Sequence, residues 1–362
     1  VGQVYHFQHY DIFSGLGQSQ VSDIEQDRFG YIWLSTRGGG LSRFDGARFV
    51  NYQIGDKDSP PGIEGIYESK SGYYWITTTR GTYRFNPNDA KQIDSTSSRL
   101  NAEFVGPNRG QFLEDSKGNF WFTTFGLSLI HEKEEKAEFE KYDLNLPPDI
   151  SSKIGIGEII EAIDGSIWLK ANNGIIRMLP DKRTVFYPFE KILNNGNTSL
   201  MTDKKGNIWF CRNNVLLVIK PEPIETFANA PQTTFRQLQP AAVIELKPES
   251  NYQLPQKDGE IFQFTSLENN RFIEKSYSKK AFETSDGNVW VTAENNLLEF
   301  ANGTLHLHSD KEGLPVVMSR MEEDAAGNLW IGGYSGLARI DRHGIVSYGA
   351  DDGANSSRFF AI

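Results

Sequence analysis

Tryptophan recurs along this chain at nearly even intervals, and this spacing constrains the fold more than any other feature. The seven Trp residues stand at 33, 75, 121, 168, 209, 290 and 330, so successive gaps are 42, 46, 47, 41, 81 and 40 residues. Because 81 is about twice 40, one unit is expected to have lost its Trp, and Tyr252 in ESNYQLPQKDGEIFQF takes that place. The spacing therefore predicts eight units of 40–47 residues.

Every unit repeats the same order of strands and turns. An apolar stretch such as VSDIEQD precedes a tight turn, and a Trp-containing strand such as YIWLST follows it. A Gly- or Asn-containing turn then leads to a third strand such as LSRFD and a more polar fourth strand such as ARFVNYQI. Four antiparallel strands in this length is the period of a β-propeller blade. The sequence predicts an all-β fold, a single β-propeller over residues 1–362 with eight four-stranded blades, and seven blades as the alternative.

The Trp-containing strand indicates how the blades pack. Tyr31, Ile32, Trp33 and Leu34 place large apolar side chains on both faces of one strand. A sheet with one solvated face would alternate, whereas a sheet between two neighbours need not. Each Trp is therefore predicted to fill the space between adjacent blades. The N-terminal YHFQHYDI resembles a fourth strand and is expected to complete the last blade, although GIVSYGA near the C-terminus competes for that place.

Composition excludes several classes of function. The formal net charge is −10 and no basic stripe appears, which argues against a nucleic-acid surface. No apolar run approaches the roughly 18–20 residues that span a bilayer, so this piece is not expected to be embedded in a membrane. The single cysteine, Cys211, excludes an intrachain disulfide and a thiolate metal cluster, and its apolar strand predicts a buried, inert thiol.

The repeated phrase resembles a known family. GLGQSQVSDIEQDRFGYIWLSTRGGGLSRFDG (residues 15–46) is similar to the two-component regulator propeller repeat, as is EGLPVVMSRMEEDAAGNLWIGGYSGLARID (residues 312–341). Weaker copies are ESKSGYYWITTTRGTYRFN and EDSKGNFWFTTFGLSLI. The resemblance implies the periplasmic sensing region of a bacterial inner-membrane receptor. It also implies, beyond this chain, an Ig-like sandwich, one transmembrane helix and a cytoplasmic histidine kinase or similar output domain. The family commonly has seven blades per propeller.

The sequence offers no catalytic or metal-binding set. None of the six His pairs with another His, Glu or Cys at a ligand spacing, so neither a metal site nor a cofactor is expected. The third-strand arginines, which recur in register, are interpreted as structural pairs. The Asp residues before the turns are predicted to bond their own turn backbone, because the calcium-loop pattern is absent. These arginines are Arg43, Arg84, Arg177 and Arg339, and the aspartates are Asp27, Asp115, Asp164, Asp203, Asp286 and Asp324.

The loops after the Trp-containing strands carry the candidate binding residues. They share one rim of the ring with the loops between blades, and propellers usually bind ligands there. The residue four places after Trp varies in chemistry although its surroundings repeat. Together with three neighbouring donors this slot gives a set that suits hydrogen bonding and stacking against a carbohydrate or other small polar ligand. The candidates are Arg37, Arg80, Phe125, Lys170, Asn172, Arg212, Glu294 and Tyr334.

Three hypotheses of function follow. The favoured one is a non-catalytic periplasmic sensor propeller that recognises a polar ligand such as an oligosaccharide and signals through a membrane helix absent from this chain. The second is a propeller hydrolase or lyase acting on a polysaccharide or lactone, which needs a convergent pair of carboxylates in the central funnel. The third is a protein-interaction scaffold, with homodimerisation through the rim left open.

Overall fold

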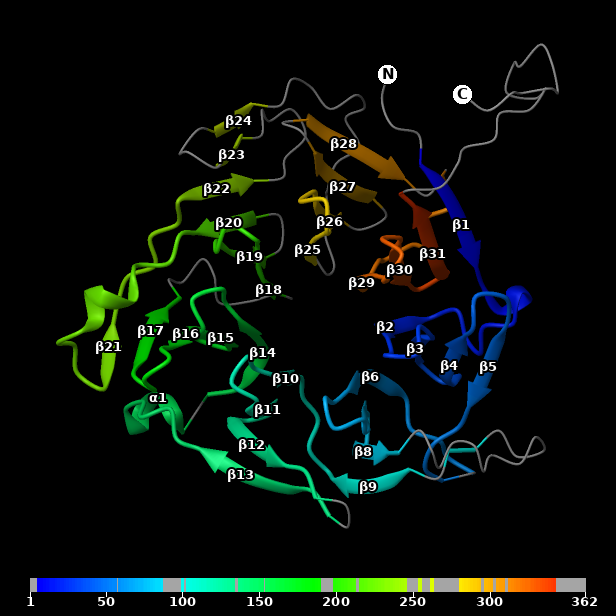
Figure 1. Ribbon diagram of the computed structural model, residues 1–362, viewed down its shortest axis with the longest axis horizontal. Helices are drawn as coiled ribbons and strands as arrows, with labels where there is room; N and C mark the ends of the chain where they lie inside the picture. The colour runs from blue at the N-terminus through cyan, green and yellow to red at the C-terminus, as the bar shows by residue number, and fades with distance from the viewer. Residues whose placement is uncertain are drawn as a thin grey trace.

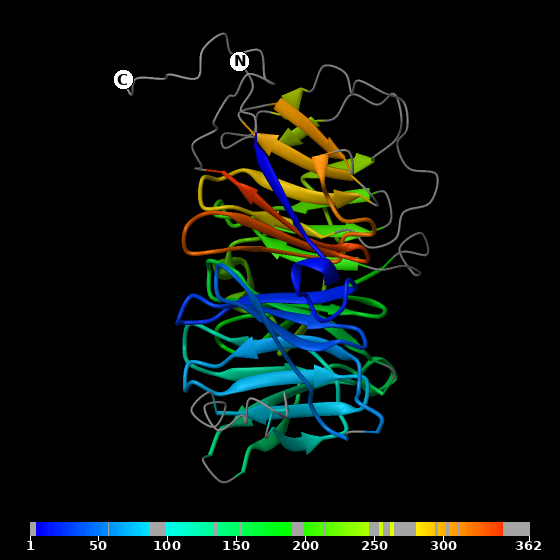
Figure 2. The same ribbon diagram turned by 90° about the vertical axis from the view of Figure 1, so that its right-hand side faces the viewer.

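The computed structural model shows a ring of sheets (Figure 1), and residues of their inner strands line a central channel. It describes residues 5–56, 58–86, 99–100, 102–133, 136–152, 154–189, 198–212, 215–245, 253–255, 261–263, 280–293, 296–301, 304–309 and 312–342. Turned by 90°, the sheets lie stacked one on another (Figure 2). No helix in these ranges is both long enough and apolar enough to cross a membrane.

Seven sheets radiate from the channel and form the blades, numbered here along the chain. Blade 1 contains β2 (Val21–Gln26), β3 (Ile32–Thr36), β4 (Gly40–Phe44) and β5 (Phe49–Tyr52). Blade 2 contains β6 (Ile63–Glu68), β7 (Tyr74–Thr78), β8 (Gly81–Phe85) and β9 (Glu103–Gly106). Blade 3 contains β10 (Phe112–Glu114), β11 (Phe120–Thr123), β12 (Leu127–His131) and β13 (Glu138–Tyr142), and α1 (Pro148–Ser151) leads onward.

The second half of the ring repeats this arrangement. Blade 4 contains β14 (Ile156–Glu161), β15 (Ile167–Ala171), β16 (Gly174–Met178) and β17 (Thr184–Pro188). Blade 5 contains β18 (Thr198–Thr202), β19 (Ile208–Arg212), β20 (Val215–Ile219) and β22 (Ala242–Glu245). Blade 6 contains β25 (Ala281–Glu283), β26 (Val289–Ala293), β27 (Asn296–Ala301) and β28 (Thr304–Ser309). Blade 7 contains β29 (Arg320–Glu323), β30 (Leu329–Gly333), β31 (Gly336–Asp341) and β1 (His6–Tyr10).

The N-terminal strand closes the ring, as the sequence predicted. β1 pairs antiparallel with β31, placing Gln8 opposite Arg339, so the first strand of the chain completes the last blade. The rival segment GIVSYGA lies outside the described residues. After β1 the short helix η1 (Ile12–Ser14) leads into blade 1. Its N-cap is Asp11, whose side chain accepts hydrogen bonds from two backbone N–H groups.

The main prediction of eight blades was wrong, and the unit around Tyr252 is the reason. Its described part is a two-stranded hairpin, β23 (Gln253–Pro255) and β24 (Ile261–Gln263). β23 lies against β22, the outer strand of blade 5, and Figure 1 shows the hairpin at the periphery of the ring. β18 and β25, the inner strands of blades 5 and 6, contact each other directly, so no blade separates them. Tyr252 itself lies outside the described residues.

A side chain seven residues before Trp links neighbouring blades through a hydrogen bond that we call a latch. In blade 2, Glu68 Oε2 accepts a hydrogen bond of 2.7 Å from Arg28 N in the first turn of blade 1. In blade 6, Glu283 Oε2 accepts the same bond, at 2.5 Å, from Lys204 N of blade 5. This second latch shows again that blades 5 and 6 are neighbours. The other latches are Glu114 to Lys70, Glu161 to Ser116, Glu323 to Ser285 and Gln26 to Ala325.

The junction of blades 4 and 5 is built differently. Thr202 stands in the latch position, and its short side chain bonds the carbonyl of Asp203 instead. The chain between β20 and β22 runs back over this junction through η4 (Ile224–Phe227) and β21 (Thr233–Phe235). β21 pairs in parallel with β17 and gives blade 4 a fifth strand, while Phe227 is fully buried in the core between the two blades. This crossing holds the junction together in place of a latch.

The tryptophans fill the space between blades, as predicted. All seven are at most 4% exposed. In four blades an aspartate six residues earlier accepts backbone N–H bonds from its own turn with one oxygen and the indole N–H with the other. Asp115 is typical: Lys117 N and Asn119 N donate to Oδ1, and Trp121 Nε1 donates to Oδ2 at 2.8 Å. The corresponding indole bonds elsewhere are Trp33 to Asp27, Trp209 to Asp203 and Trp330 to Asp324.

The remaining aspartates and the third-strand arginines are also structural. Asp164 and Asp286 stand two places later in their turns, yet each still accepts a backbone N–H from its own turn. Arg177 pairs with Asp164 at 2.5 Å. Arg84 and Arg339 likewise pair with carboxylates of the outer parts of their blades, while Arg43 lies over the ring of its neighbour Tyr31. The aspartates bond their own turns as predicted, and Arg84, Arg177 and Arg339 form the predicted structural pairs, whereas Arg43 has no ion pair among the described residues.

Candidate functional site

The described residues enclose, in part, a central channel with a volume of about 910 Å³. Residues of all seven inner strands line it. The inner strands bring residues ten places before Trp to one level of the wall, and β2 and β14 each have a register shift immediately before this level. The residues at this level are Asp23, Gly65, Gln111, Glu158, Ser199, Lys280 and Arg320.

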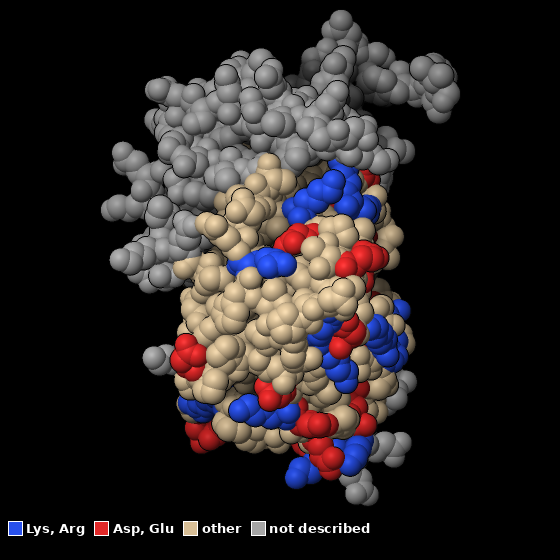
Figure 3. All heavy atoms as spheres, turned by 90° about the vertical axis from the view of Figure 1, so that its left-hand side faces the viewer, with Lys and Arg blue, Asp and Glu red and all other residues tan. Residues whose placement is uncertain are grey.

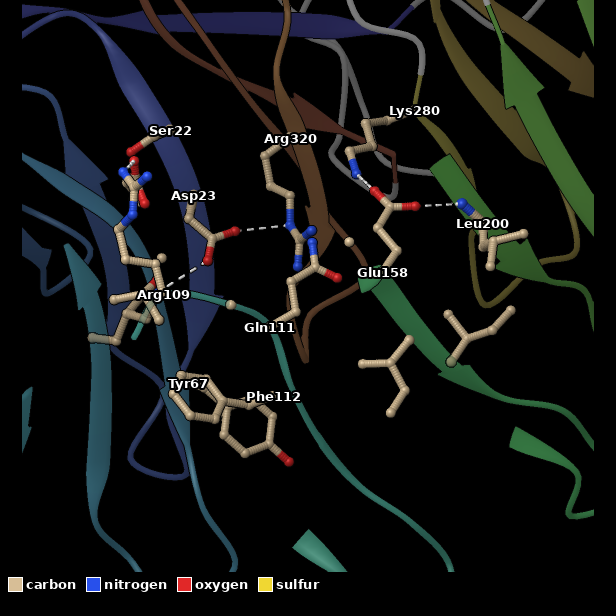
Figure 4. Close-up of a pocket in the computed structure, with 18 of the residues that line it drawn as sticks. Ser22, Asp23, Tyr67, Arg109, Gln111, Phe112, Glu158, Leu200, Lys280 and Arg320 are labelled. Atoms are coloured by element: carbon tan, nitrogen blue, oxygen red, sulfur yellow. Dashed lines mark hydrogen bonds and ion pairs between the residues drawn. The ribbon is translucent and has the colours of Figure 1, made fainter. Parts of the chain in front are cut away.

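Two ion pairs lie in the wall of the channel at this level and are drawn in Figure 4. Arg320 Nε of blade 7 lies 2.8 Å from Asp23 Oδ1 of the adjacent blade 1. Lys280 of blade 6 pairs with Glu158 of blade 4, and these two blades stand on either side of blade 5. Burial raises the pKa of Asp23, although Arg320 opposes that shift, and the carboxylate of Asp23 in turn raises the pKa of Arg320. The ion pairs thus join blades that are distant in sequence.

The same two carboxylates also hold the next inner strand. Asp23 Oδ2 accepts a hydrogen bond of 3.1 Å from Ile66 N of blade 2, and Glu158 Oε2 accepts one of 2.6 Å from Leu200 N of blade 5. Each carboxylate therefore has two partners of its own chain. A third pair, Arg109 Nη1 and Glu64 Oε1 at 3.1 Å, lies towards the start of the inner strands. These three pairs neutralise most of the charge in the channel.

A second level of the wall lies two residues further along each inner strand. Here Glu25 of blade 1 and Glu322 of blade 7 face the cavity next to each other, and both are half-buried. Burial raises the pKa of Glu322 from its ordinary 4.5 to about 7, and Asp23 and Glu323 add to the shift while Arg320 opposes it. Burial, followed by repulsion from Glu322, raises the pKa of Glu25 well above its usual range. This part of the wall therefore favours protonated carboxyl groups or a bound cation.

Aromatic and apolar side chains form much of the wall at this level. Tyr67 and Phe112 belong to adjacent blades and are labelled in Figure 4. Their ring centroids lie 5.9 Å apart. Met201 and Phe282 line the cavity from blades 5 and 6. Burial raises the pKa of the Tyr67 hydroxyl, which bonds Glu114 outside the cavity. The channel thus has an aromatic side and a side with two carboxyl groups.

The predicted rim residues do not all come together. Phe125 is 91% exposed and lines the mouth of the channel. Arg37 and Tyr334 are exposed on the same rim, in the loops that follow β3 and β30. The Arg80 guanidinium donates to Ser59 O at 2.7 Å and to Ser59 Oγ at 2.5 Å, so part of its donor capacity holds a neighbouring loop.

The other predicted site residues are placed as follows. Lys170 is half-buried at the end of β15, and Asn172 is exposed, with its side-chain oxygen accepting a hydrogen bond from Gly155 N at 3.3 Å. Gly155 belongs to the wall of the channel, so Asn172 supports that wall from behind. Arg212 ends β19, and only its backbone is described; Glu294 lies outside the described residues. A role of any of these residues in binding stays a prediction.

Sequence reasoning missed the charged residues of the channel. It compared the position four places after Trp from blade to blade, but not the positions eight and ten places before it. The latter position carries carboxylates in blades 1 and 4 and cations in blades 6 and 7, and such alternation is a signal that the repeat alone contains. The register shifts that turn Asp23 and Glu158 towards the cavity could not be read from the spacing.

On the face seen in Figure 3, which includes α1 and β21, described Lys and Arg side chains are interspersed with Asp and Glu. Within the described residues, no group of three or more His, Cys, Asp or Glu is placed to hold a metal ion. No histidine is among the described residues that line the channel.

Comparison with known proteins supports the resemblance found in the repeats. Residues 15–38 match the model of the two-component regulator propeller. The chain carries a two-component regulator propeller repeat. A 53-residue stretch is 45% identical to histidine kinase P4 of Formosa agariphila, which is 15% of this chain and 4% of that kinase. The match to the kinase therefore extends over only a small part of its length.

Solved structures resemble the propeller over nearly its whole length. The extracellular domain of the hybrid two-component system BT3049 of B. thetaiotaomicron is 18% identical, with a TM-score of 0.59, over 93% of this chain and 42% of that one. A catalytically inactive virginiamycin B lyase of Staphylococcus aureus, solved with quinupristin, is 13% identical, with a TM-score of 0.62, over 93% and 99%. At these identities both matches show the fold, and this chain spans less than half of the sensor domain.

Proposed function

We propose that this chain is a non-catalytic sensor propeller from the extracytoplasmic part of a two-component receptor, and that it binds a polar ligand such as an oligosaccharide at the mouth of the channel. The matched repeat and the likeness to an extracellular domain of a hybrid two-component system support the sensor role. A ligand that binds one pose of the propeller better than another would shift a two-state equilibrium and pass the signal to a kinase or similar output domain.

The observation that carries the proposal is the channel itself. A volume of about 910 Å³ lies in the range of cavities that bind small ligands. Its wall combines charged groups with aromatic rings, and Phe125 stands at its mouth. Hydrogen-bonding groups beside exposed rings suit a sugar, because its ring faces are apolar and its edges carry hydroxyl groups.

A thermal-shift screen against neutral oligosaccharides and small metabolites tests this proposal. We expect at least one ligand to raise the melting temperature of the unmodified chain, and Phe125→Ala, Tyr334→Ala or Arg37→Ala to reduce that rise. Phe29→Ala is the matched control, because Phe29 is also exposed but lies in the turn between β2 and β3, at the opposite end of the blade. Equal ligand-induced rises in melting temperature in all four variants would show that these rim residues do not contribute to the binding site.

A hydrolase or lyase is the second candidate, and one observation favours it. Glu25 and Glu322 face the same cavity, which meets the need of a glycosidase for two carboxyl groups. A carboxyl group with a pKa of about 7, as in Glu322, suits a general acid. Release of product from a polysaccharide, lactone or ester by the purified chain, abolished in Glu322→Gln, would establish this function in place of the sensor.

A further inference from the structure

Among the described residues that line the channel, the charges do not balance. These residues include five carboxylates and three cations. Each cation pairs with one carboxylate: Arg320 with Asp23, Lys280 with Glu158 and Arg109 with Glu64. Glu25 and Glu322 are left, and no described residue gives either of them a hydrogen bond or an ion pair. Within this cavity they are the exception, because this chain provides a partner for every other carboxylate.

The surroundings of these two carboxyl groups disfavour two adjacent negative charges. Both groups are half-buried in the wall and repel each other. The cation that acts on both groups is Arg320, whose Nε pairs with Asp23. The charged groups that act on the pair from the neighbouring strands are Asp23, Glu68, Arg320 and Glu323. Three of these four are acidic, so the local field attracts a positive charge from solution.

The rest of the wall indicates what else the ligand contains. Tyr67, Phe112 and Phe282 are among the residues that line the same cavity. A sugar ring can lie against such surfaces, and a cation is attracted to their faces. The volume of about 910 Å³ is larger than a single ammonium group would require, so the cavity has room for a body attached to it.

We propose that the channel binds an amine-bearing saccharide, with the protonated amine between Glu25 and Glu322 and the sugar rings against the aromatic side. The proposal rests on the ligand-binding function proposed above and names the chemical class of its ligand. A primary ammonium group has three donors, enough to bond both carboxylates and a third acceptor. Binding of the ammonium group offsets the repulsion between the two carboxylates, which a neutral ligand cannot do.

Calorimetric titration of the whole chain at pH 7.5 tests the proposal. The probes are the trimer of glucosamine, its fully N-acetylated counterpart and spermidine. The first two share a skeleton and differ in charge, whereas the third is a cation without sugar rings. We expect the glucosamine trimer to bind at least about tenfold more tightly than either of the others, since a tenfold change corresponds to about 1.4 kcal/mol.

Two variants locate the amine. Glu25→Gln and Glu322→Gln are each expected to weaken binding of the glucosamine trimer at least about tenfold. Glu64→Gln is the matched control, since it removes a channel carboxylate that already has Arg109 as its partner, and is expected to change affinity less than about threefold. Titrations in two buffers of different ionisation enthalpy should show proton release on binding near pH 7, because the ammonium group favours the ionised form of Glu322.

The outcomes separate this inference from the function on which it rests. Equal affinity for the acetylated trimer would contradict the proposed recognition of the amine and would leave the sensor proposal unaffected. Spermidine binding as tightly as the glucosamine trimer would overturn the saccharide part. No binding of any probe would overturn this inference, and failure of the wider thermal-shift screen as well would overturn the proposed function. If both Gln variants bind the glucosamine trimer with unchanged affinity, the amine does not bind between Glu25 and Glu322.

Discussion

The hydrogen bonds of Asp115 give the sharpest test of how the repeated turn holds a blade. Asp115 is 3% exposed and accepts bonds from Lys117 N, Asn119 N, Asn119 Nδ2 and Trp121 Nε1, all between 2.7 and 3.0 Å. In Asp115→Asn one side-chain oxygen can still accept the two backbone bonds. The new amide group, however, meets two donors, and the buried indole N–H then has no acceptor.

The expected cost follows from these bonds. A buried donor without a partner costs about 1–3 kcal/mol, and bonds to a charged group contribute more than neutral ones. Solvent can reach Asn119 in part but not the indole of Trp121, which is 3% exposed, so we expect Asp115→Asn to lower the free energy of unfolding by about 2–4 kcal/mol. Urea denaturation followed by far-UV circular dichroism, fitted with one slope for all variants, measures this change.

A double-mutant cycle isolates the bond to the indole. Trp121→Phe keeps an aromatic wedge and removes the N–H donor, so in that background Asp115→Asn should cost about 1–2 kcal/mol less than in the unmodified chain. Asp149→Asn, at an exposed position in α1, is the control and should change the free energy of unfolding by less than about 0.5 kcal/mol. A coupling energy near zero, or an Asp115→Asn variant as stable as the control, would refute the proposed role of the aspartate.

Three further outcomes are expected from the structure. Trp168→Ala should lower the free energy of unfolding by about 3–5 kcal/mol, because Trp168 is fully buried between blades; a loss below about 1 kcal/mol in urea denaturation would contradict its role as a wedge. Glu283→Ala should cost about 1–2 kcal/mol, since it leaves the N–H of Lys204 without its acceptor, and Glu283→Gln, which keeps an oxygen, should cost less in the same assay. Between pH 7 and 4.5 the folded chain holds a proton on Glu322 that the unfolded chain releases, because the pKa of Glu322 is raised in the folded state. This group therefore adds stability as the pH falls through that range. The melting temperature should rise less over the same range in Glu322→Gln, and identical melting profiles of the two proteins would argue against the raised pKa.

The architecture was predictable because a propeller repeats one local problem. Each blade must pack the same large apolar side chain against its neighbour. Trp, the turn aspartate and the Gly of the turn therefore recur together, and their periodicity is visible in the sequence. Phe125 was also found from the sequence, because it varies in a slot whose neighbours do not, and it does stand at the mouth of the channel. The match of residues 15–38 confirmed the resemblance of the repeat.

The number of blades was not predictable from the same pattern. The segment around Tyr252 fits the spacing, but spacing records only that a hairpin occurs, not whether its strands reach the channel. The described hairpin β23–β24 lies outside blade 5, while the bond from Lys204 N to Glu283 joins blades 5 and 6 directly. The number of blades depends on how many sheets pack around one axis before the ring closes, which is a property of the whole ring.

The sequence by itself determined the β-propeller fold, the packing of Trp between blades and the part played by the N-terminal strand in closing the ring. These follow from local rules that every blade obeys separately. Only the tertiary structure decided that seven blades meet, and that Glu25 and Glu322, 297 positions apart in the sequence, face one cavity with no cationic side chain paired to either among the described residues. The physical reason is that the interaction between those two charges depends on their separation in space, and ring closure brings the first and last blades together.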